Sequence, residues 1–288
     1  MSGGSDLRQS ATPVRAIVFM VSAMALFAGM DAINKTLTQG YAIPQIMAVR
    51  FAIFVAIACL VARRGPWLVL QTRAPWWQAL RTGVLLLEMT SFVLSFRYLP
   101  LADVHAVAAA SPLLVTALAA VFLREKVDAI GWGLVTGGLV GAALVVGPAF
   151  ESFGPAMWFA VAGAFLWGVY QVITRRVASL DHADITTLHT PLVGFAVLGT
   201  LALFDWRAPD ATGWLLLASG GAMGGLAHLL LIRALATAPA SELQPYNYFL
   251  LVFAAALGAT VYGDIPGAWT WVGAGIVVLC GIAAMRRR

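Results

Sequence analysis

The chain alternates between long apolar stretches of about 20 residues and short polar or basic connections. An apolar α-helix of about 20 residues crosses the hydrocarbon core of a bilayer, whereas a spanning β-strand needs only about ten residues of alternating polarity. The pattern therefore predicts an all-α polytopic membrane protein with ten transmembrane helices. The expected spans are residues 15–36, 43–62, 76–97, 102–123, 129–147, 154–177, 185–204, 212–234, 239–261 and 267–285. Pairs such as Gly147-Pro148 and Gly154-Pro155 are expected to separate them.

Composition narrows the class of protein further. Hydrophobic residues make up 61% of the 288 residues and charged residues only 11%, against about 25% charged residues in soluble domains. The net charge of +5 would suit nucleic acid, but the basic residues lie in short loops, where the membrane surface explains them better. We therefore expect a lipid bilayer and no nucleic acid as partner. Cys59 and Cys280 lie in apolar stretches and give no disulfide or metal spacing.

The basic residues also predict the orientation of the chain. Because loops rich in Lys and Arg stay in the cytoplasm, both termini are expected there, in a bacterial-type inner membrane. Residues 1–14 would be a cytoplasmic tail and residues 286–288 a basic cytoplasmic end. The cytoplasmic side would carry 14 of the 18 basic residues, namely Arg8, Arg15, Arg63, Arg64, Arg73, Arg81, Arg124, Lys126, Arg175, Arg176, Arg233, Arg286, Arg287 and Arg288.

Weak similarity recurs along the chain at an offset of 136 to 139 residues. The matching segments are 25–29 with 164–168, 96–99 with 232–235, and 132 with 271. Each unit would hold five spans, an odd number, so the second unit must enter the membrane upside down. We therefore expect two inverted five-helix repeats, residues 15–148 and 154–285, an arrangement typical of transporters with a binding site near the midplane.

Charged residues inside the expected spans are candidates for that site, because a charge in the hydrocarbon core is costly unless it is paired or faces a cavity. Glu88 lies near the centre of its span and should face a cavity or a cation. Arg50 lies about two turns inside the second span, and Asp31 or Glu88 could be its partner. Asp31 and Lys35, four residues apart, could instead pair with each other near the interface.

Aromatic and amide side chains mark the sixth span. Trp167, Tyr170 and Gln171 share one helical face. Such a face suits a planar or amphipathic substrate, and it is equally compatible with ordinary helix packing. In the eighth span, His228 could carry a proton or simply hold a hydrogen bond. Gly224, which the repeat places opposite Glu88, predicts either a central void or hinge, or close helix packing.

Polarity is concentrated at the start of the ninth span, in Ser241–Tyr248. Pro245 should make this helix irregular, and irregular polar backbone at membrane depth is tolerated only where it is buried in protein or lines a cavity. Tyr248 would lie roughly 13 Å deep at about 1.5 Å per residue. We interpret Gln244, Tyr246, Asn247 and Tyr248 as one wall of a substrate pathway, with an interfacial aromatic belt as the alternative.

The chain carries no catalytic motif. It lacks a Gly-x-x-x-x-Gly-Lys-Ser/Thr loop, His-Glu-x-x-His and Gly-x-Ser-x-Gly. No catalytic residue, cofactor or metal is expected, and the protein is not expected to be an enzyme. An intramembrane enzyme using His189, His228 and Glu242 is a remote alternative.

Ten spans, inverted halves and very short loops resemble the drug/metabolite transporter superfamily, specifically its EamA-type exporters. The residues that carry this resemblance are Phe27-Ala28-Gly29, Lys35, Arg50, Ser111-Pro112, Glu125, Leu166-Trp167-Gly168 and Gly263-Asp264. Arg124 stands where the family usually has Gly, and Asp264 where it usually has Glu. Within the family, the aromatic and polar lining is similar to that of bacterial YddG-type exporters, which handle aromatic amino acids.

The resemblance implies a secondary transporter that exports small amphipathic metabolites, most of all amino acids, by alternating access around a central cavity. A multidrug or quaternary-cation exporter is the alternative, and a channel or receptor is a further one. The protein would act as a monomer or weak homodimer.

Overall fold

The computed structural model describes residues 13–62, 66–122, 127–178, 180–181, 183–237 and 246–286. These residues form helices joined by short turns, and no strand occurs among them. The first-half helices are α1 (Val14–Leu37), α2 (Ile43–Ala62), α3 (Pro75–Tyr98), α4 (Leu101–Ala108), α5 (Ser111–Phe122) and α6 (Ala129–Phe153). The second-half helices are α7 (Met157–Ala178), α8 (Ala183–Ala202), α9 (Ala211–Thr237), α11 (Phe249–Leu257) and α12 (Ala268–Arg286).

Short irregular helices fill several connections. They are η1 (Pro66–Gln71), η2 (Gly154–Ala156), η3 (Leu203–Asp205) and the π-helical η4 (Gly258–Tyr262), which prolongs α11. With α4 and α5 counted as one span and α11 with η4 as another, the helices agree with the ten predicted spans. By length and composition alone, seven helices of the described residues are long and apolar enough to cross a membrane, and shorter apolar helices accompany them.

The fourth span differs from its prediction as one continuous helix. α4 ends at Ala108, a turn follows at Ala109 and Ala110, and α5 begins at Ser111. Pro112 explains the break, because its backbone nitrogen carries no hydrogen and cannot donate to a carbonyl of the preceding turn. In the second half a turn occurs at Tyr248, just before α11. The two breaks are 139 residues apart, the offset of the repeat.

The predicted break at Gly147-Pro148 is wrong, since α6 continues through it to Phe153. The turn comes at Gly154, whose φ of 59° is left-handed and therefore suits a glycine. Pro155 then prevents α6 from continuing.

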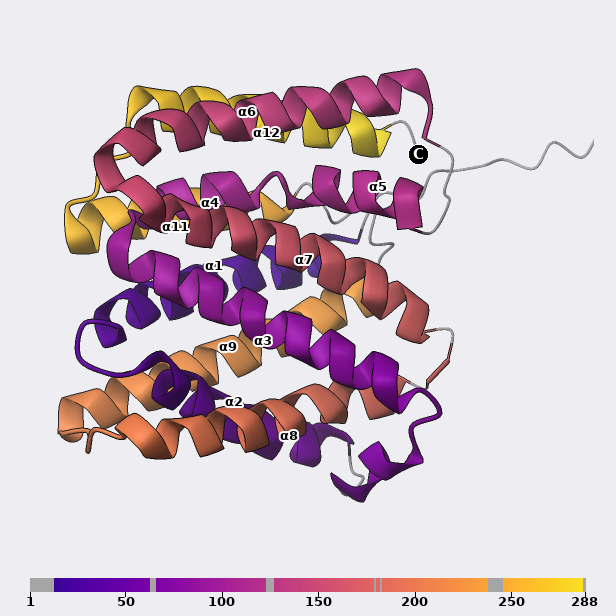
Figure 1. The fold of residues 1–288 in the computed structure, drawn as a ribbon, viewed down its shortest axis with the longest axis vertical. Coiled ribbons are helices and arrows are strands. Elements are labelled where there is room, and N and C mark those ends of the chain that lie inside the picture. Colours follow the sequence, from indigo (N-terminus) through magenta and orange to yellow (C-terminus); the bar gives the residue numbers. More distant parts are fainter. Residues whose placement is uncertain are drawn as a thin grey trace, which may run out of the picture.

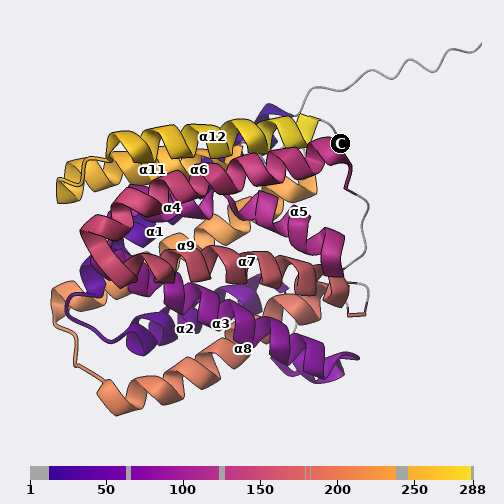
Figure 2. The same ribbon diagram turned by 45° about the horizontal axis from the view of Figure 1, so that its top comes forward.

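Eight of the ten spans form a closed ring. Each packs on the next in the order α1, α9, α2, α8, α3, α7, the α4/α5 span and α11, which returns to α1. α6 and α12 pair outside the ring, against α4 and α5, and lie side by side in both ribbon views (Figures 1 and 2). Exchange of the two halves would convert the α1–α9 pair into the α7–α3 pair and leave the α2–α8 and α6–α12 pairs unchanged, as inverted repeats require.

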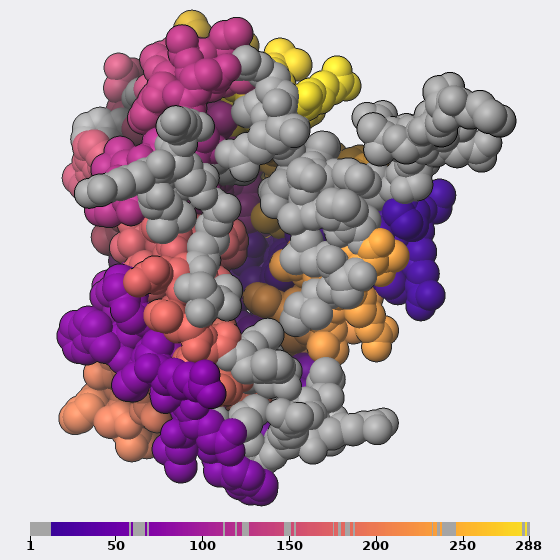
Figure 3. Space-filling model, turned by 90° about the vertical axis from the view of Figure 1, so that its right-hand side faces the viewer, coloured from indigo at the N-terminus to yellow at the C-terminus, as the bar shows by residue number. Residues whose placement is uncertain are grey.

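The two ends of the bundle are distinct. α1 begins and α12 ends on the right of Figure 1, and we call this the terminal end. The opposite end, which carries the turn at residues 38–42 and the turn between α3 and α4, is the far end. A view onto the terminal end shows a hollow between the α3 and α7 side and the α9 and α1 side (Figure 3).

Candidate functional site

Three charged side chains from three helices are buried in the middle of the bundle. Asp31 of α1, Arg50 of α2 and Glu88 of α3 are only 8%, 5% and 6% exposed. Arg50 interacts electrostatically with both acids. This arrangement brings together three residues that the sequence predicted as site residues, and it buries all three charges inside the protein.

The direct contacts of Arg50 are two sulfur atoms. One terminal nitrogen of its guanidinium donates to Sδ of Met30 at 3.2 Å, and the other donates to Sδ of Met47. Its Nε is buried without a hydrogen-bond partner, and so is Oε2 of Glu88. Buried polar atoms are nearly always hydrogen-bonded, so this donor and this acceptor are positions that an ordered water or a bound molecule would complete.

Aromatic rings border this charged cluster. The ring of His228, on α9, makes edge contacts with Phe27 of α1 at 4.9 Å and with Phe54 of α2 at 5.2 Å between centroids. Nδ1 of His228 lies 2.8 Å from the carbonyl oxygen of Gly224. His228 also interacts electrostatically with Arg50. The centre therefore combines a guanidinium, a carboxylate and flat rings from both halves of the chain.

Asp31 connects the cluster to α4. Its Oδ2 lies 3.3 Å from Nε2 of His105, and Nδ2 of Asn34 donates to its Oδ1 at 3.5 Å. Asp31 does not pair with Lys35, contrary to the alternative considered from their spacing. Lys35 points to the far end instead.

The far end is closed by contacts between the halves. Nζ of Lys35 lies 2.5 Å from Oδ2 of Asp264 and donates to the carbonyl oxygen of Leu99 at 3.0 Å. The hydroxyl of Tyr262 donates to the carbonyl oxygen of Ala32 and lies 2.7 Å from the hydroxyl of Thr36. These contacts tie α1 to the residues that follow α11.

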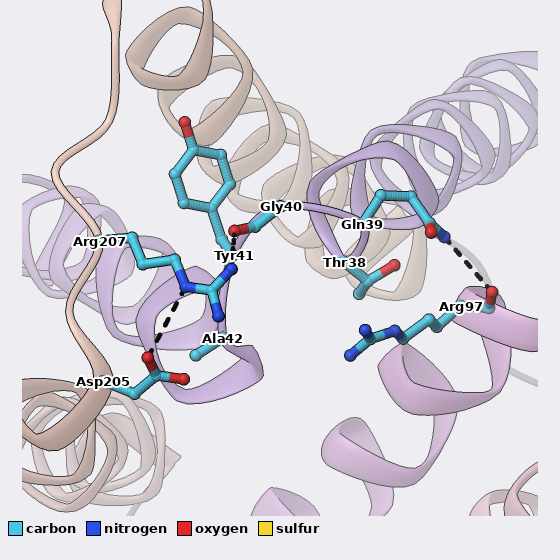
Figure 4. Close-up of a pocket in the computed structure, with 8 residues that line it drawn as sticks. All are labelled: Thr38, Gln39, Gly40, Tyr41, Ala42, Arg97, Asp205 and Arg207. Carbon is cyan, nitrogen blue, oxygen red and sulfur yellow. Dashed lines mark hydrogen bonds and ion pairs between the residues drawn. The ribbon is translucent and has the colours of Figure 1, made fainter.

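A small pocket of about 70 Å³ lies beside this closure, at the turn between α1 and α2 (Figure 4). Arg207 donates to the carbonyl oxygen of Gly40 at 3.0 Å, and Gln39 donates to the carbonyl oxygen of Arg97 at 3.3 Å. Gln45 exchanges two hydrogen bonds with the backbone of Arg207, at 2.7 and 3.0 Å. These contacts join the connection between α8 and α9 to the first half as well.

A second polar cluster lies toward the terminal end, around the buried Arg81 of α3. Arg81 donates to the hydroxyl of Tyr170 and to the carbonyl oxygen of Thr186, both at 3.0 Å, to the hydroxyl of Thr190, and to Oε1 of Gln78 at 3.2 Å. α3 is thereby fixed to both α7 and α8.

Asp181 extends this cluster into the connection between α7 and α8. It accepts hydrogen bonds from the hydroxyl of Thr72, from the backbone N–H of Arg73 at 2.7 Å, and from Nε2 of Gln78 at 2.8 Å. Burial opposes ionisation, but these three hydrogen bonds together hold the pKa of Asp181 below its usual value.

The predicted site residues thus separate into groups. Asp31, Arg50, Glu88 and His228 come together at the centre. Trp167 and Tyr170 stack at 5.5 Å between centroids, and Tyr170 joins the Arg81 cluster. Gln171 is the next residue on α7 and is partly buried.

The segment at the start of the ninth span is only partly described. Tyr246 stacks on Phe249 and packs on the apolar cluster that α1 contributes, and Asn247 is partly buried. The hydroxyl of Tyr248 lies against Gly281 of α12, so this side chain turns to the outer helix pair. Gln244 lies outside the described residues.

Several residues of these clusters were not predicted, and four of them matter most here. Met30 and Met47 are apolar by sequence, and only the fold reveals them as acceptors for Arg50. Arg81 was counted as a basic residue of the membrane surface, and Asp181 was not considered. A signal for Arg81 was available, since it lies six residues inside its helix rather than in a loop.

Comparison with known proteins agrees with this architecture. A crystal structure superimposes with a TM-score of 0.64 at 20% identity, over 94% of this chain and 98% of that chain, and it therefore shares the fold. The chain is 28% identical to a riboflavin transporter of Vibrio cholerae, over 93% of this chain and 91% of that protein. It is 26% identical to an S-adenosylmethionine uptake transporter of Rickettsia bellii, over 73% and 72%. It is 24% identical to the pseudopaline exporter CntI of Pseudomonas aeruginosa, over 94% and 96%.

The chain also matches a known protein family. The EamA-like transporter family matches the chain twice, at residues 14–147 and 154–286. The matched residues include the central charged cluster and the contacts that close the far end. This protein is therefore a multi-pass membrane transporter that belongs to the EamA-like transporter family.

Proposed function

We propose that this chain is a secondary transporter that binds a small amphipathic metabolite between Arg50 and Glu88 and exposes it alternately to the two ends. The observation that carries the proposal is that Nε of Arg50, a donor, and Oε2 of Glu88, an acceptor, are both buried in the central cluster without a hydrogen-bond partner. A substrate with both an acceptor and a donor would satisfy them together. In such transporters the two repeats, here residues 15–148 and 154–285, move around a fixed central site.

The unequal ends support alternating access. Lys35, Asp264 and Tyr262 close the far end, whereas the terminal end is hollowed (Figure 3). This is the arrangement expected of a carrier open to one side only. We place the terminal end in the cytoplasm, because Arg73, Arg176 and Arg233 lie toward it and basic residues favour that side of an inner membrane.

Amino acids, aromatic ones in particular, are our first substrate class. The carboxylate of a zwitterion would bind Arg50, its ammonium would bind Glu88, and a ring would lie against Phe27, Phe54 and His228. Two of the relatives are named as transporters of riboflavin and of S-adenosylmethionine. These names support flat heteroaromatic metabolites as further candidate substrates beside aromatic amino acids. We propose export as the direction of transport. Among the relatives, CntI is named as an exporter, and the S-adenosylmethionine transporter is named for uptake.

A site for a simple organic cation fits the centre less well. Such a site needs a buried acid without a nearby fixed base, because a fixed positive charge repels the ligand in a medium of low dielectric constant. The buried guanidinium of Arg50 interacts electrostatically with Glu88. A multidrug cation exporter is therefore the second candidate.

Counterflow in proteoliposomes tests the proposal. Vesicles preloaded with unlabelled tryptophan, riboflavin, S-adenosylmethionine or tetraethylammonium would be given the labelled compound outside, with protein-free vesicles as the control. We expect saturable counterflow of tryptophan or riboflavin. Counterflow of tetraethylammonium alone would favour the cation exporter, and no saturable flux of any compound would contradict the proposal.

A further inference from the structure

The acceptors of Arg50 are unusual for a buried arginine. Two carboxylates, Asp31 and Glu88, interact with it electrostatically, yet its terminal nitrogens donate to the thioether sulfurs of Met30 and Met47. A thioether is a weak acceptor and carries no charge. A carboxylate forms a stronger, charge-assisted hydrogen bond with arginine, often through two N–H groups. The sulfurs thus hold the guanidinium in place without neutralising it.

Helix packing places the two sulfurs. Met47 lies three residues before Arg50 on α2, so both side chains share one helical face. Met30 comes from α1 and fills the space beside Gly224 of α9. A Cβ atom at residue 224 would lie 2.7 Å from Sδ of Met30 and 3.3 Å from the ring of Phe54. The missing side chain at Gly224 therefore leaves room for the sulfur that contacts Arg50.

The sequence left open whether Gly224 marks a central void or hinge, or close helix packing. The residue facing the charged cluster from α9 is packed against Met30 and Phe54, so Gly224 provides close helix packing rather than a void. Its packing partner is the same methionine that contacts Arg50.

We propose that Arg50 is the receptor for a carboxylate or similar anionic group of the transported molecule, and that Met30, Met47 and Gly224 are positioning residues that keep its charge available. This inference rests on the proposed function and names the group that the site selects. The free Nε and the two weakly held terminal nitrogens offer an incoming carboxylate three donor nitrogens. Binding exchanges weak sulfur acceptors for a charged one.

Arg50 and Glu88 interact electrostatically but form no direct ion pair, and sulfur acceptors for Arg50 account for this. A direct ion pair would satisfy both groups in the empty carrier, and a substrate would have to break it. With the guanidinium held by sulfur, Glu88 keeps a free oxygen for a donor of the same substrate. Loss of the sulfur contacts would let Arg50 turn toward Asp31 and become unavailable, while Glu88 stays free.

A matched pair of glycine variants tests this idea. In Gly224→Ala the new methyl group displaces Sδ of Met30. In Gly221→Ala, three residues away on α9, it meets Cδ1 of Ile53 at 2.4 Å instead. Both changes crowd a flexible side chain, but only the first one affects Arg50. The readout is inhibition of labelled tryptophan counterflow by tryptophan and by tryptamine, which differ in the carboxylate.

We expect wild-type protein and Gly221→Ala to prefer tryptophan over tryptamine by about tenfold or more, as a hydrogen bond to a charged group implies. Gly224→Ala should lose this preference by weakening tryptophan binding while leaving tryptamine binding unchanged. Met47→Leu keeps the volume, removes the sulfur and should act in the same direction, which guards against misfolding of the alanine variant. Arg50→Lys should abolish the preference.

Three outcomes would overturn the inference. They are equal inhibition by both compounds in wild-type protein, equal effects of Gly224→Ala and Gly221→Ala on the preference, and an unchanged preference in Met47→Leu. Saturable counterflow with any of these results leaves the transporter itself standing. Absence of saturable flux in wild-type protein would instead overturn the proposed function, and this inference with it.

Discussion

Lys35 and Asp264 meet at the far end, with Nζ of the lysine 2.5 Å from Oδ2 of the aspartate. The same ammonium donates to the carbonyl oxygen of Leu99 and lies 5.0 Å from the centre of the Tyr262 ring. One side chain of α1 therefore holds the end of α3 and the residues after α11 together. Because these elements belong to both halves of the chain, the ion pair is suited to keeping the far end closed.

Removal of the aspartate charge should open the far end. Asp264→Asn weakens a partly exposed ion pair, which is worth about 1 kcal/mol, so the open population should rise about fivefold. A cysteine in place of the buried Asn34, in a background without Cys59 and Cys280, would report this through its rate of labelling by a membrane-impermeant maleimide. Asp205→Asn, which changes an exposed aspartate at the same end, is the control. An equal labelling rate of this cysteine with and without Asp264→Asn would contradict the assignment.

Asp181 should make the fold sensitive to acid. Its pKa is lower in the folded protein than the usual value of about 3.9. The stability it contributes is therefore fully present above pH 4 and is lost as the pH falls through the folded pKa. Asp181→Asn should lower the melting temperature by about 5 °C at pH 7, and this difference should shrink toward pH 3. Thermal melts of purified protein between pH 3 and pH 7 would measure it, and a difference independent of pH would contradict the role of the charge.

Arg81 should be a structural residue that lysine cannot replace. Its guanidinium makes four hydrogen bonds to α3, α7 and α8, and an ammonium group cannot reach the same acceptors with fork geometry. Arg81→Lys should lower the melting temperature by about 5 °C or more. Tyr170→Phe removes one of these hydrogen bonds and should have a smaller effect.

The exposed Arg233 provides the control for this comparison. Arg233→Lys should leave the melting temperature unchanged within about 1 °C, since exposed substitutions seldom matter. Equal melting temperatures for Arg81→Lys and Arg233→Lys would show that the Arg81 cluster does not stabilise the fold.

The helical architecture was predictable because the membrane imposes it. Backbone groups in hydrocarbon must be satisfied within the chain, so each apolar stretch of sufficient length becomes a helix. The break at Ala109 and Ala110 was not predicted, although Pro112 was visible as its cause. The opposite error occurred at Pro148. The sequence predicted that a helix ends there, but α6 continues to Phe153.

The site was predictable only in part. Asp31, Arg50 and Glu88 stand out because charges are rare at this depth, and the fold brings them together. Their partners are set by tertiary packing, which spacing along the chain does not encode. Arg50 contacts sulfur rather than an acid. Asp181 reaches Gln78 from a position 103 residues away.

Glu88 offers the most direct test of the central claim that substrate binds in the middle of this bundle. Glu88→Gln keeps the shape of the side chain and removes its charge, and Glu151→Gln makes the same change at an exposed position. Initial rates of saturable counterflow would be compared in proteoliposomes, at equal amounts of folded, inserted protein. We predict that Glu88→Gln lowers the rate at least about tenfold, since a hydrogen bond to a charged group is lost, whereas Glu151→Gln retains the wild-type rate. Wild-type rates and half-saturation in Glu88→Gln would contradict the account.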